Sequence, residues 1–199
     1  MDESFGHTSV DSDEALVAKC QKGERSAFDG LVLRYQKKVF NITYRMVGNY
    51  TEASDLAQEA FVRAYKSIKK FRGHSSFYTW LYTIASNLCR NRLRYLRRQR
   101  KSVVSLDDPV QTEEGVVSRE VADKSLSPMA ILGRKEKVEF VQKAINSLDE
   151  EHRIVVVLRD IEMLPYDEIC RILKVNSGTI KSRLHRARSL LREKLKDVI

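Results

Sequence analysis

Basic residues gather at two places in this 199-residue sequence, and at both places their spacing suits the binding of a polyanion. The first is 90–101, RNRLRYLRRQRK, which holds seven basic residues and no acidic one. The second is 177–195, where Lys and Arg are interleaved with apolar residues. Because Lys and Arg neutralise phosphates, both stretches are candidates for nucleic-acid binding. The formal charge of +9 and the pI near 9.5 also favour nucleic acid over a membrane surface.

The sequence lacks the motifs of common catalytic and metal sites. It has no Walker loop, HExxH, GxSxG or acid pair with an evident role, which predicts a protein that is not an enzyme and uses no cofactor. Cys20, Cys89 and Cys170 lie far apart in the sequence. Isolated buried thiols are therefore favoured over a disulfide framework or a metal site.

Secretion and membrane insertion are not indicated. The initial segment MDESFGHTSVDSDE is acidic and lacks the apolar core of a signal peptide. No apolar run approaches the ~20 residues that span a bilayer. We therefore expect a soluble, cytoplasmic chain.

Apolar residues recur at the 3.6-residue period of an α-helix through most of the chain, and alternating strand patterns are missing. Asp11 or Ser12 is expected to cap a first helix, Gly48-Asn49 to end a second and Thr51 to cap a third. The segment FRGHSS, 71–76, is a short break before the next helix. These patterns predict an all-α protein.

The composition changes at Ser102. Residues 102–128 carry six acidic residues against two basic ones, five serines and few large apolar residues, which predicts a flexible acidic linker. Helical periodicity returns near Arg134, and Ser147–Glu150 fits a capping box. We therefore expect two helical domains. The predicted parts are a flexible N-terminus at 1–11, a first domain at 12–101, the linker at 102–128 and a second domain at 129–199.

The stretch 164–195 has the pattern of a helix-turn-helix, in which a short amphipathic helix precedes a tight turn at 174–177. Ser177 is expected to cap the longer second helix, whose apolar stripe is Ile180, Leu184, Ala187, Leu191 and Leu195. The second helix of such a pair enters a DNA major groove. A basic helix pair in a bundle is the alternative, but turn, cap and charge placement together favour DNA. The candidate DNA-binding residues are Ser177, Thr179, Lys181, Ser182, Arg183, His185, Arg186 and Arg188.

The stretch 77–101 places four aromatic residues in its first six positions, ahead of the arginine run. Its apolar stripe is expected in the core and consists of Phe77, Leu81, Ile84 and Leu88, with Trp80 adjacent. Tyr78 and Tyr82 lie beside that stripe and are ambiguous. The polar stripe is the candidate DNA face and consists of Thr79, Thr83, Ser86, Asn87, Arg90, Asn91 and Arg94.

Both helical stretches resemble bacterial sigma factors, specifically the small extracytoplasmic-function (ECF) class. The segment SLDEEHRIVVVLRDIEMLPYDEICRILKVNSGTIKSRLHRAR is similar to sigma region 4, and DLAQEAF and FYTWLY are the most specific matches to region 2. The chain leaves no room for the acidic N-terminal segment and middle domain of other classes, which favours the ECF class. Pro165 departs from the family, whose members usually carry a small hydroxyl residue there. Because proline is tolerated in a first helical turn, we expect the helix with a different cap.

The resemblance implies site residues in the first domain. One helix face would bind core RNA polymerase through Asp55, Gln58, Glu59, Val62 and Arg63. A base flipped out of the −10 promoter element would be held by Phe71, Arg72, Gly73, His74, Ser75, Ser76 and Asn87, with Arg90, Asn91 and Arg94 along the strand. The residues alone would favour a solvated face and an ordinary interhelical turn.

The resemblance further implies an alternative sigma factor that binds core RNA polymerase and reads −35 duplex and −10 single-stranded promoter DNA. It would start transcription of a stress or envelope-response regulon and be held inactive by an anti-sigma factor. Two other classes compete with it. A helix-turn-helix repressor would explain 164–195 but not DLAQEAF or the linker, and a structured-RNA-binding enzyme subunit would explain only the charge.

Overall fold

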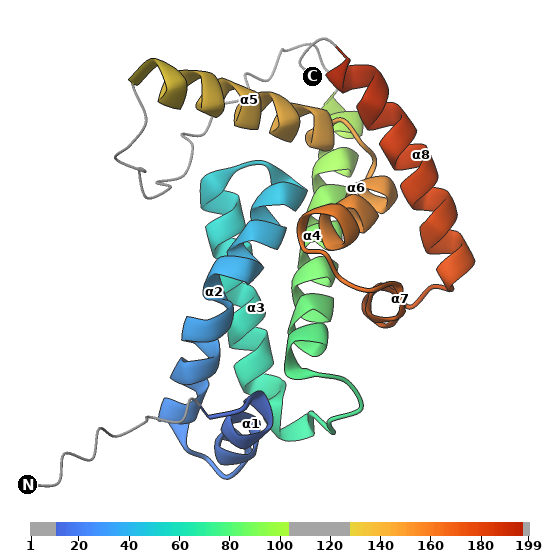
Figure 1. Cartoon of the computed structure of the whole chain (residues 1–199). Coiled ribbons are helices and arrows are strands. Elements are labelled where there is room, and N and C mark those ends of the chain that lie inside the picture. The colour runs from blue at the N-terminus through green and yellow to red at the C-terminus, as the bar shows by residue number, and fades with distance from the viewer. Residues whose placement is uncertain (1–10, 104–127, 197–199) are drawn as a thin grey trace, which may run out of the picture.

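The computed structural model describes residues 11–103 and 128–196, and every regular element among them is helical (Figure 1). The predicted all-α class is therefore confirmed. In chain order the elements are α1 (Asp13–Gln21), α2 (Arg25–Val47), α3 (Tyr50–Ser67), η1 (Ile68–Lys70), α4 (Phe77–Val103), α5 (Pro128–Asn146), α6 (Glu150–Val156), η2 (Val157–Ile161), α7 (Tyr166–Leu173) and α8 (Ser177–Leu195). We call α1–α4 the first half and α5–α8 the second half.

Two predicted segments fall largely outside the described residues, namely 1–10 of the N-terminus and 104–127 of the linker. The described ends of that linker are helical, since α4 continues to Val103 and α5 begins at Pro128. Proline suits a first helical position because the missing N–H has no partner there in any case. The second helical segment therefore begins earlier than Arg134, where periodicity becomes visible.

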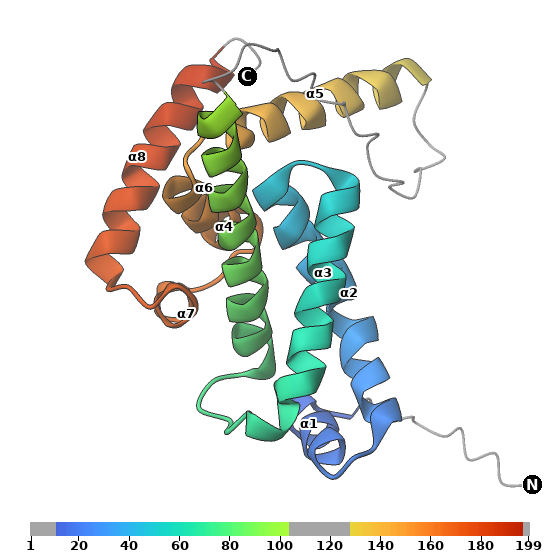
Figure 2. The ribbon, with the colours of Figure 1, turned by 180° about the vertical axis from the view of Figure 1, so that it is seen from behind.

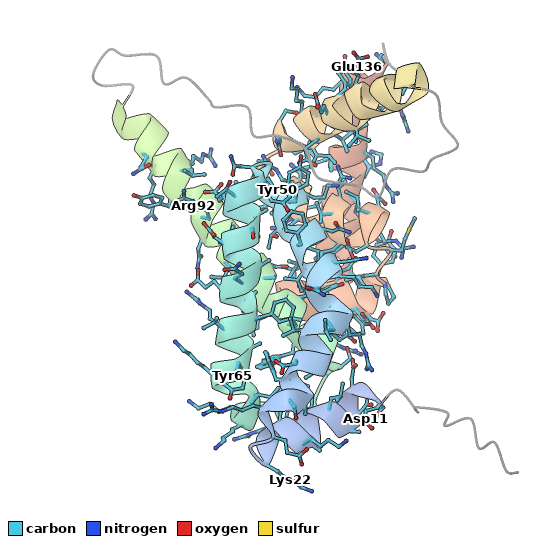
Figure 3. The ribbon with its side chains drawn as sticks, turned by 90° about the vertical axis from the view of Figure 1, so that its left-hand side faces the viewer. Asp11, Lys22, Tyr50, Tyr65, Arg92 and Glu136 are labelled. Atoms are coloured by element: carbon cyan, nitrogen blue, oxygen red, sulfur yellow. The ribbon has the colours of Figure 1, made fainter. Side chains whose placement is uncertain are left out.

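In the first half, α2, α3 and α4 stand side by side and α1 crosses one end of them (Figures 1 and 2). The predicted stripes form their shared core, in which Leu31, Ile42, Ala60 and Leu81 have no exposed surface. Alanines on α3 let the neighbouring helices approach closely. The arginine run of α4 starts at the end of the bundle opposite Lys22, where Arg92 lies near Tyr50 (Figure 3) and pairs with Glu52.

The helix caps differ from the predicted ones by one or two residues. Ser12 caps α1 as predicted, because its Oγ accepts from the Ala15 N–H at 3.2 Å. Three other caps are corrected, because in each case a polar residue in extended conformation accepts an N–H of the first turn. Asn49 replaces Thr51, Asp149 replaces Ser147 and Asn176 replaces Ser177.

In the second half, α6, α7 and α8 enclose Ile154, Leu158, Ile169, Ile180 and Leu184, all buried. The α7 helix forms after Pro165 as expected, although no side chain caps it. Instead, the Pro165 carbonyl accepts from the Ile169 N–H at 3.1 Å. The segment η2 is a wide π-type turn that follows α6 directly.

The two halves pack against each other. Buried side chains from both belong to one connected apolar cluster. The helix α7 lies against α4, while α5 and η2 contact α2 (Figures 1 and 2). Nothing in the sequence patterns pointed to this contact, which places the second half beside the arginine-bearing helix of the first.

Candidate nucleic-acid interface

The α4 helix presents its candidate DNA-binding residues on one face. Asn87, Asn91 and Arg94 are exposed and Arg90 is half-buried. Their spacing of three or four residues brings the side chains into one row along the helix. The exposed Arg97 and Arg98 continue the cationic surface toward the helix end, so this row can follow a phosphate backbone.

The polar stripe predicted for this helix is only partly exposed. Thr79 and Ser86 are buried, with 2% and 1% of their surface accessible. The Thr83 hydroxyl donates to the Thr79 carbonyl at 2.8 Å, one turn earlier. Small hydroxyl side chains fit between packed helices, so these residues face inward. The prediction that Thr79 and Ser86 belong to the exposed face is therefore wrong.

The break before α4 is anchored at its first residue. Gln21, at the end of α1, donates through Nε2 to the carbonyls of Ile68 at 3.1 Å and Phe71 at 2.8 Å. The Phe71 ring is half-buried and lies 5.0 Å from the Trp80 ring, centroid to centroid. Phe71 therefore fixes where the break starts, and its ring is already used in packing.

The rest of the break leaves a short exposed turn. Arg72, Gly73 and His74 are exposed, and Ser75 is half-buried. Gly73 has φ +71°, which glycine adopts without steric cost, as expected for the tight turn. Ser76 caps α4, because its Oγ accepts from the Thr79 N–H at 3.3 Å. Arg72 and His74 are thus open to a ligand, and Ser76 is also exposed although its hydroxyl serves the cap.

The α8 helix presents a second cationic surface. Ser177, Lys181, Ser182, His185 and Arg186 are exposed on it. Beneath them, Ile180, Leu184 and Ala187 of the predicted stripe are buried, whereas Leu191 and Leu195 are partly buried. The apolar side therefore fixes the rotation of α8 so that its basic side faces outward.

The start of α8 is fixed by Asn176. Its Oδ1 accepts from both the N–H and the hydroxyl of Thr179, at 2.8 and 2.9 Å. The half-buried Thr179 is therefore part of the cap. Asparagine is a strong N-cap residue, and its place one position before Ser177 was the signal that the sequence analysis missed.

Two of the predicted DNA-binding arginines on α8 are held by acids of the same half. Arg183 pairs with Glu151 at 2.7 Å, and Arg188 Nε donates to Asp160 at 3.0 Å. These pairs orient the helix and reduce the free charge of both side chains. A hollow of about 280 Å³ between α7 and α8 is lined by Tyr166, Lys181, Leu184, His185, Arg188, Ser189 and Arg192.

The exposed face of α3 carries the residues implied for polymerase binding. Asp55, Gln58, Glu59, Val62 and Arg63 are all exposed. Arg63 and Glu59 form an ion pair of 2.6 Å one turn apart, and Val62 keeps 49% of its surface accessible. A single exposed apolar residue is common on protein surfaces, so this face is accessible to a partner but its exposure does not identify one.

Metal and membrane sites are not found within the described ranges. No group of three or more His, Cys, Asp or Glu side chains there could hold a metal ion. Cys20 and Cys89 are buried and Cys170 is half-buried, and burial raises the pKa of Cys89 to about 12. None of the helices found between 11 and 103 or 128 and 196 is long and apolar enough to cross a membrane.

Known proteins are similar to this chain in both halves. Residues 31–100 match the family described as Sigma-70 region 2, and residues 141–191 match Sigma-70, region 4. The ECF RNA polymerase sigma factor SigW of Bacillus subtilis is 40% identical over 184 residues, covering 92% of this chain and 96% of SigW. The ECF RNA polymerase sigma-E factor of Escherichia coli K12 is 37% identical over 189 residues, covering 94% and 96%.

Solved structures agree in fold. The sigma factor RpoE of Bartonella quintana, in complex with the anti-sigma factor NepR, has a TM-score of 0.62 at 25% identity, covering 86% of this chain and 98% of that one. CnrH in complex with the cytosolic domain of CnrY has a TM-score of 0.65 at 21% identity, covering 95% and 100%. The matched regions and the two cationic helices define a protein of the Sigma-70 type. Within that type, the chain belongs to the ECF RNA polymerase sigma factors.

Proposed function

We propose that this chain directs core RNA polymerase to promoters by gripping two separate stretches of DNA. The α8 helix reads the −35 duplex, with Lys181, Ser182, His185 and Arg186 directed at the groove. The α4 helix and the exposed turn 71–76 hold the −10 element as a single strand. The observation that carries this proposal is that each half bears one exposed cationic helix face, in a chain similar to ECF sigma factors over both halves.

The −10 part of the proposal assigns unequal roles to the predicted residues. Asn87, Asn91 and Arg94 offer hydrogen bonds and charge along α4, and Arg72 and His74 are open to an extruded base. Phe71 and Ser76 act indirectly, since one packs against Trp80 and the other caps α4. Phe71 and Ser76 would therefore hold the shape of the turn, while a few other side chains would contact the DNA.

Energetics require a larger assembly for strand opening. Opening about ten base-pair steps costs roughly 14 kcal/mol, at ~1.4 kcal/mol per step. Stacking returns only ~1–3 kcal/mol for each captured base. The isolated chain should therefore melt DNA poorly, and core polymerase must supply the remaining contacts. Robust strand opening by the chain alone, measured with a fluorescent base, would contradict this.

Core RNA polymerase and an anti-sigma factor are the proposed protein partners. The exposed face of α3, with Val62 among charged residues, suits a docking site for the polymerase. The relative from Bartonella quintana was solved with an anti-sigma factor, which supports an equivalent regulator for this chain. We propose a stress or envelope-response regulon and no enzymatic activity of the chain itself. The predicted units 12–101 and 129–199 would be the two gripping modules.

Reconstitution tests the function directly. Tagged chain is mixed with core RNA polymerase, recovered by pull-down and assayed for run-off transcription on promoters selected from a random library. We expect stoichiometric capture of polymerase and transcripts that begin at a fixed distance from −35 and −10 sequences. Binding to a palindrome without polymerase would instead support a repressor. An Asp55→Lys, Val62→Glu variant should lose capture while keeping its fold, because both residues are exposed.

A further inference from the structure

The hollow between α7 and α8 has a lining that the proposed DNA contacts explain only in part. Ser189 and Arg192 of α8 lie outside the set of predicted DNA-binding residues, and so does Tyr166 at the start of α7. The two helices pack against each other (Figures 1 and 2). The hollow of about 280 Å³ is close to the lower end of the size range of small-molecule sites. Its size therefore suits a compact ligand.

Basic side chains line one wall of the hollow, and no acidic residue lines it. The row consists of Lys181, His185, Arg188 and Arg192, all on α8. Their spacing of three or four residues places them on one face of the helix. Among the residues that the structure describes, Lys181, His185 and Arg192 have no ion-pair or hydrogen-bond partner for their side chains. Much of this positive charge is therefore available to an anionic ligand.

Asp160 fixes the orientation of Arg188 within this row. Arg188 Nε donates to Asp160 Oδ2 at 3.0 Å, and Arg188 Nη2 donates to Asp160 Oδ1 at 2.5 Å. This two-bond geometry holds the guanidinium plane in place. The carboxylate also offsets the charge of Arg188, so the free charge of the row lies mainly at Lys181 and Arg192.

Tyr166 gives the hollow an aromatic wall. Its ring is half-buried, and the Arg159 guanidinium lies over it, 4.8 Å from the ring centroid. Arg159 Nη1 donates in turn to the Leu164 carbonyl at 2.8 Å, which holds the guanidinium against the ring. The buried Leu184 adds an apolar surface to the same lining. A ring held in this way can pack against a planar group of a ligand with little loss of side-chain entropy.

We propose that this hollow binds a nucleoside diphosphate, whose phosphates contact Lys181 and Arg192 and whose base packs on Tyr166. Charge-assisted hydrogen bonds and a stacking surface are the contacts that such a ligand requires. In a DNA duplex the base faces are already stacked on one another. A free nucleotide, by contrast, offers an open base face together with clustered phosphates, which matches both parts of the lining.

A bound nucleotide has a regulatory consequence that rests on the proposed function. Lys181 and His185 belong both to the hollow and to the proposed −35 surface. The nucleotide and the −35 duplex therefore compete for α8. The chain reads −35 DNA less well as the nucleotide concentration rises.

Equilibrium dialysis of the full chain tests the ligand class. The probes are ADP, GDP, pyrophosphate and adenosine, and both nucleotides are included because stacking on an aromatic ring is tolerant of the base. Each nucleotide should bind at least about tenfold more tightly than pyrophosphate or adenosine, because only the nucleotide fills both parts of the hollow. Absence of binding by both nucleotides, or equal binding of pyrophosphate, would overturn the proposal.

Matched variants locate the site on α8. Arg192→Ala removes a free charge from the hollow and should weaken ADP binding about tenfold. Arg186→Ala removes the same charge at an exposed position of α8 outside the hollow, and should weaken it less than about twofold. Tyr166→Leu should weaken ADP binding but leave pyrophosphate binding unchanged. Equal losses of ADP affinity in Arg192→Ala and Arg186→Ala would mean that the nucleotide is attracted only by the general charge of α8.

A competition assay separates this proposal from the proposed function. The chain is assembled with core RNA polymerase, and its binding to a fluorescent promoter fragment is measured with and without ADP. ADP should displace the promoter from the unmodified complex and fail to displace it from the Arg192→Ala complex, which also controls for ADP bound by the polymerase. Equal displacement in both complexes overturns the competition. Promoter binding without nucleotide binding in dialysis sinks the nucleotide site alone, whereas nucleotide binding without promoter binding leaves the site standing and sinks the proposed function.

Discussion

The helices α4 and α8 carry similar cationic faces, but their arginines are paired differently. On α8, Arg183 and Arg188 are held by Glu151 and Asp160 of the same half. On α4, Arg92 pairs with Glu52 of the same half, whereas Arg94 is held by Glu150 of the other half. The α8 surface is therefore complete within its own module, whereas the α4 surface depends on where the second half lies. Under the proposed function, one DNA-reading surface would be permanent and the other would be conditional.

The strongest test of this comparison disables each surface in turn within the polymerase complex. Lys181→Ala with Arg186→Ala should cost about 2–6 kcal/mol of promoter binding, at ~1–3 kcal/mol per contact. Asn87→Ala with Arg90→Ala should leave initial binding nearly intact and lower strand opening, measured by permanganate reactivity of unpaired thymines. If both variants transcribe as well as the unmodified chain, neither helix face is the DNA-binding surface.

The second test removes the buried arginine that joins the halves. Arg153 donates to the carbonyls of Met46, Asn146 and Leu148, and burial lowers its pKa to about 10. Arg153→Ala leaves these carbonyls unpaired and should lower the free energy of unfolding by about 3 kcal/mol, measured in denaturant. Arg171→Ala, which removes an exposed ion pair with Asp167, should change it by less than about 1 kcal/mol. Equal losses of unfolding free energy in the two variants would mean that Arg153 stabilises the protein no more than an exposed ion pair does.

A feature could be predicted from the sequence when the residues that form it lie close together along the chain. Helices, the break at 71–76 and the outward faces of α3 and α8 arise from spacing within one or two turns, so periodicity predicted them. The contact between the halves does not arise from local spacing, because its bonds join residues far apart in the sequence, such as Arg153 and Met46, which are separated by 107 positions. Glu150 looked fully explained as the acid of the capping box at Ser147–Glu150. Gln21 likewise gave no local sign of holding Phe71.

The third test changes backbone strain in the second half. Met163 has φ +56° and keeps 73% of its surface exposed, so it has an unfavourable backbone and little packing to lose. Met163→Gly should stabilise the fold by about 1 kcal/mol, seen as a higher Tm. Met163→Ala keeps the strained conformation and should leave Tm nearly unchanged. A Tm that falls in the glycine variant would show that the side chain has a partner.

The smallest expected effect is a pH dependence of the contact between the halves. Burial raises the pKa of Glu162 above its ordinary 4.5, while Lys38, Tyr82 and Arg45 oppose the shift. The state in which the two halves are packed therefore binds more protons than a state in which they are separated, between pH 4.5 and the raised pKa. Lowering the pH into that window should favour the packed state, and raising it should favour separation of the halves. Scattering at several pH values should show this trend, and Glu162→Gln should remove it.

The wide turn η2 has a consequence for how this arrangement can change. Within its span and the next residue, Asp160 reaches Arg188 of α8 while Glu162 reaches Tyr82 of α4. Each added or deleted helical residue rotates the downstream part of the chain by about 100°. Deletion of Ile161, which separates the two acids, would change the angle between their side chains, so that Asp160 and Glu162 would no longer reach Arg188 and Tyr82 together. The number of residues in η2 thus determines whether this turn can contact α8 and α4 at the same time. A change in that number would break the paired contacts in one step.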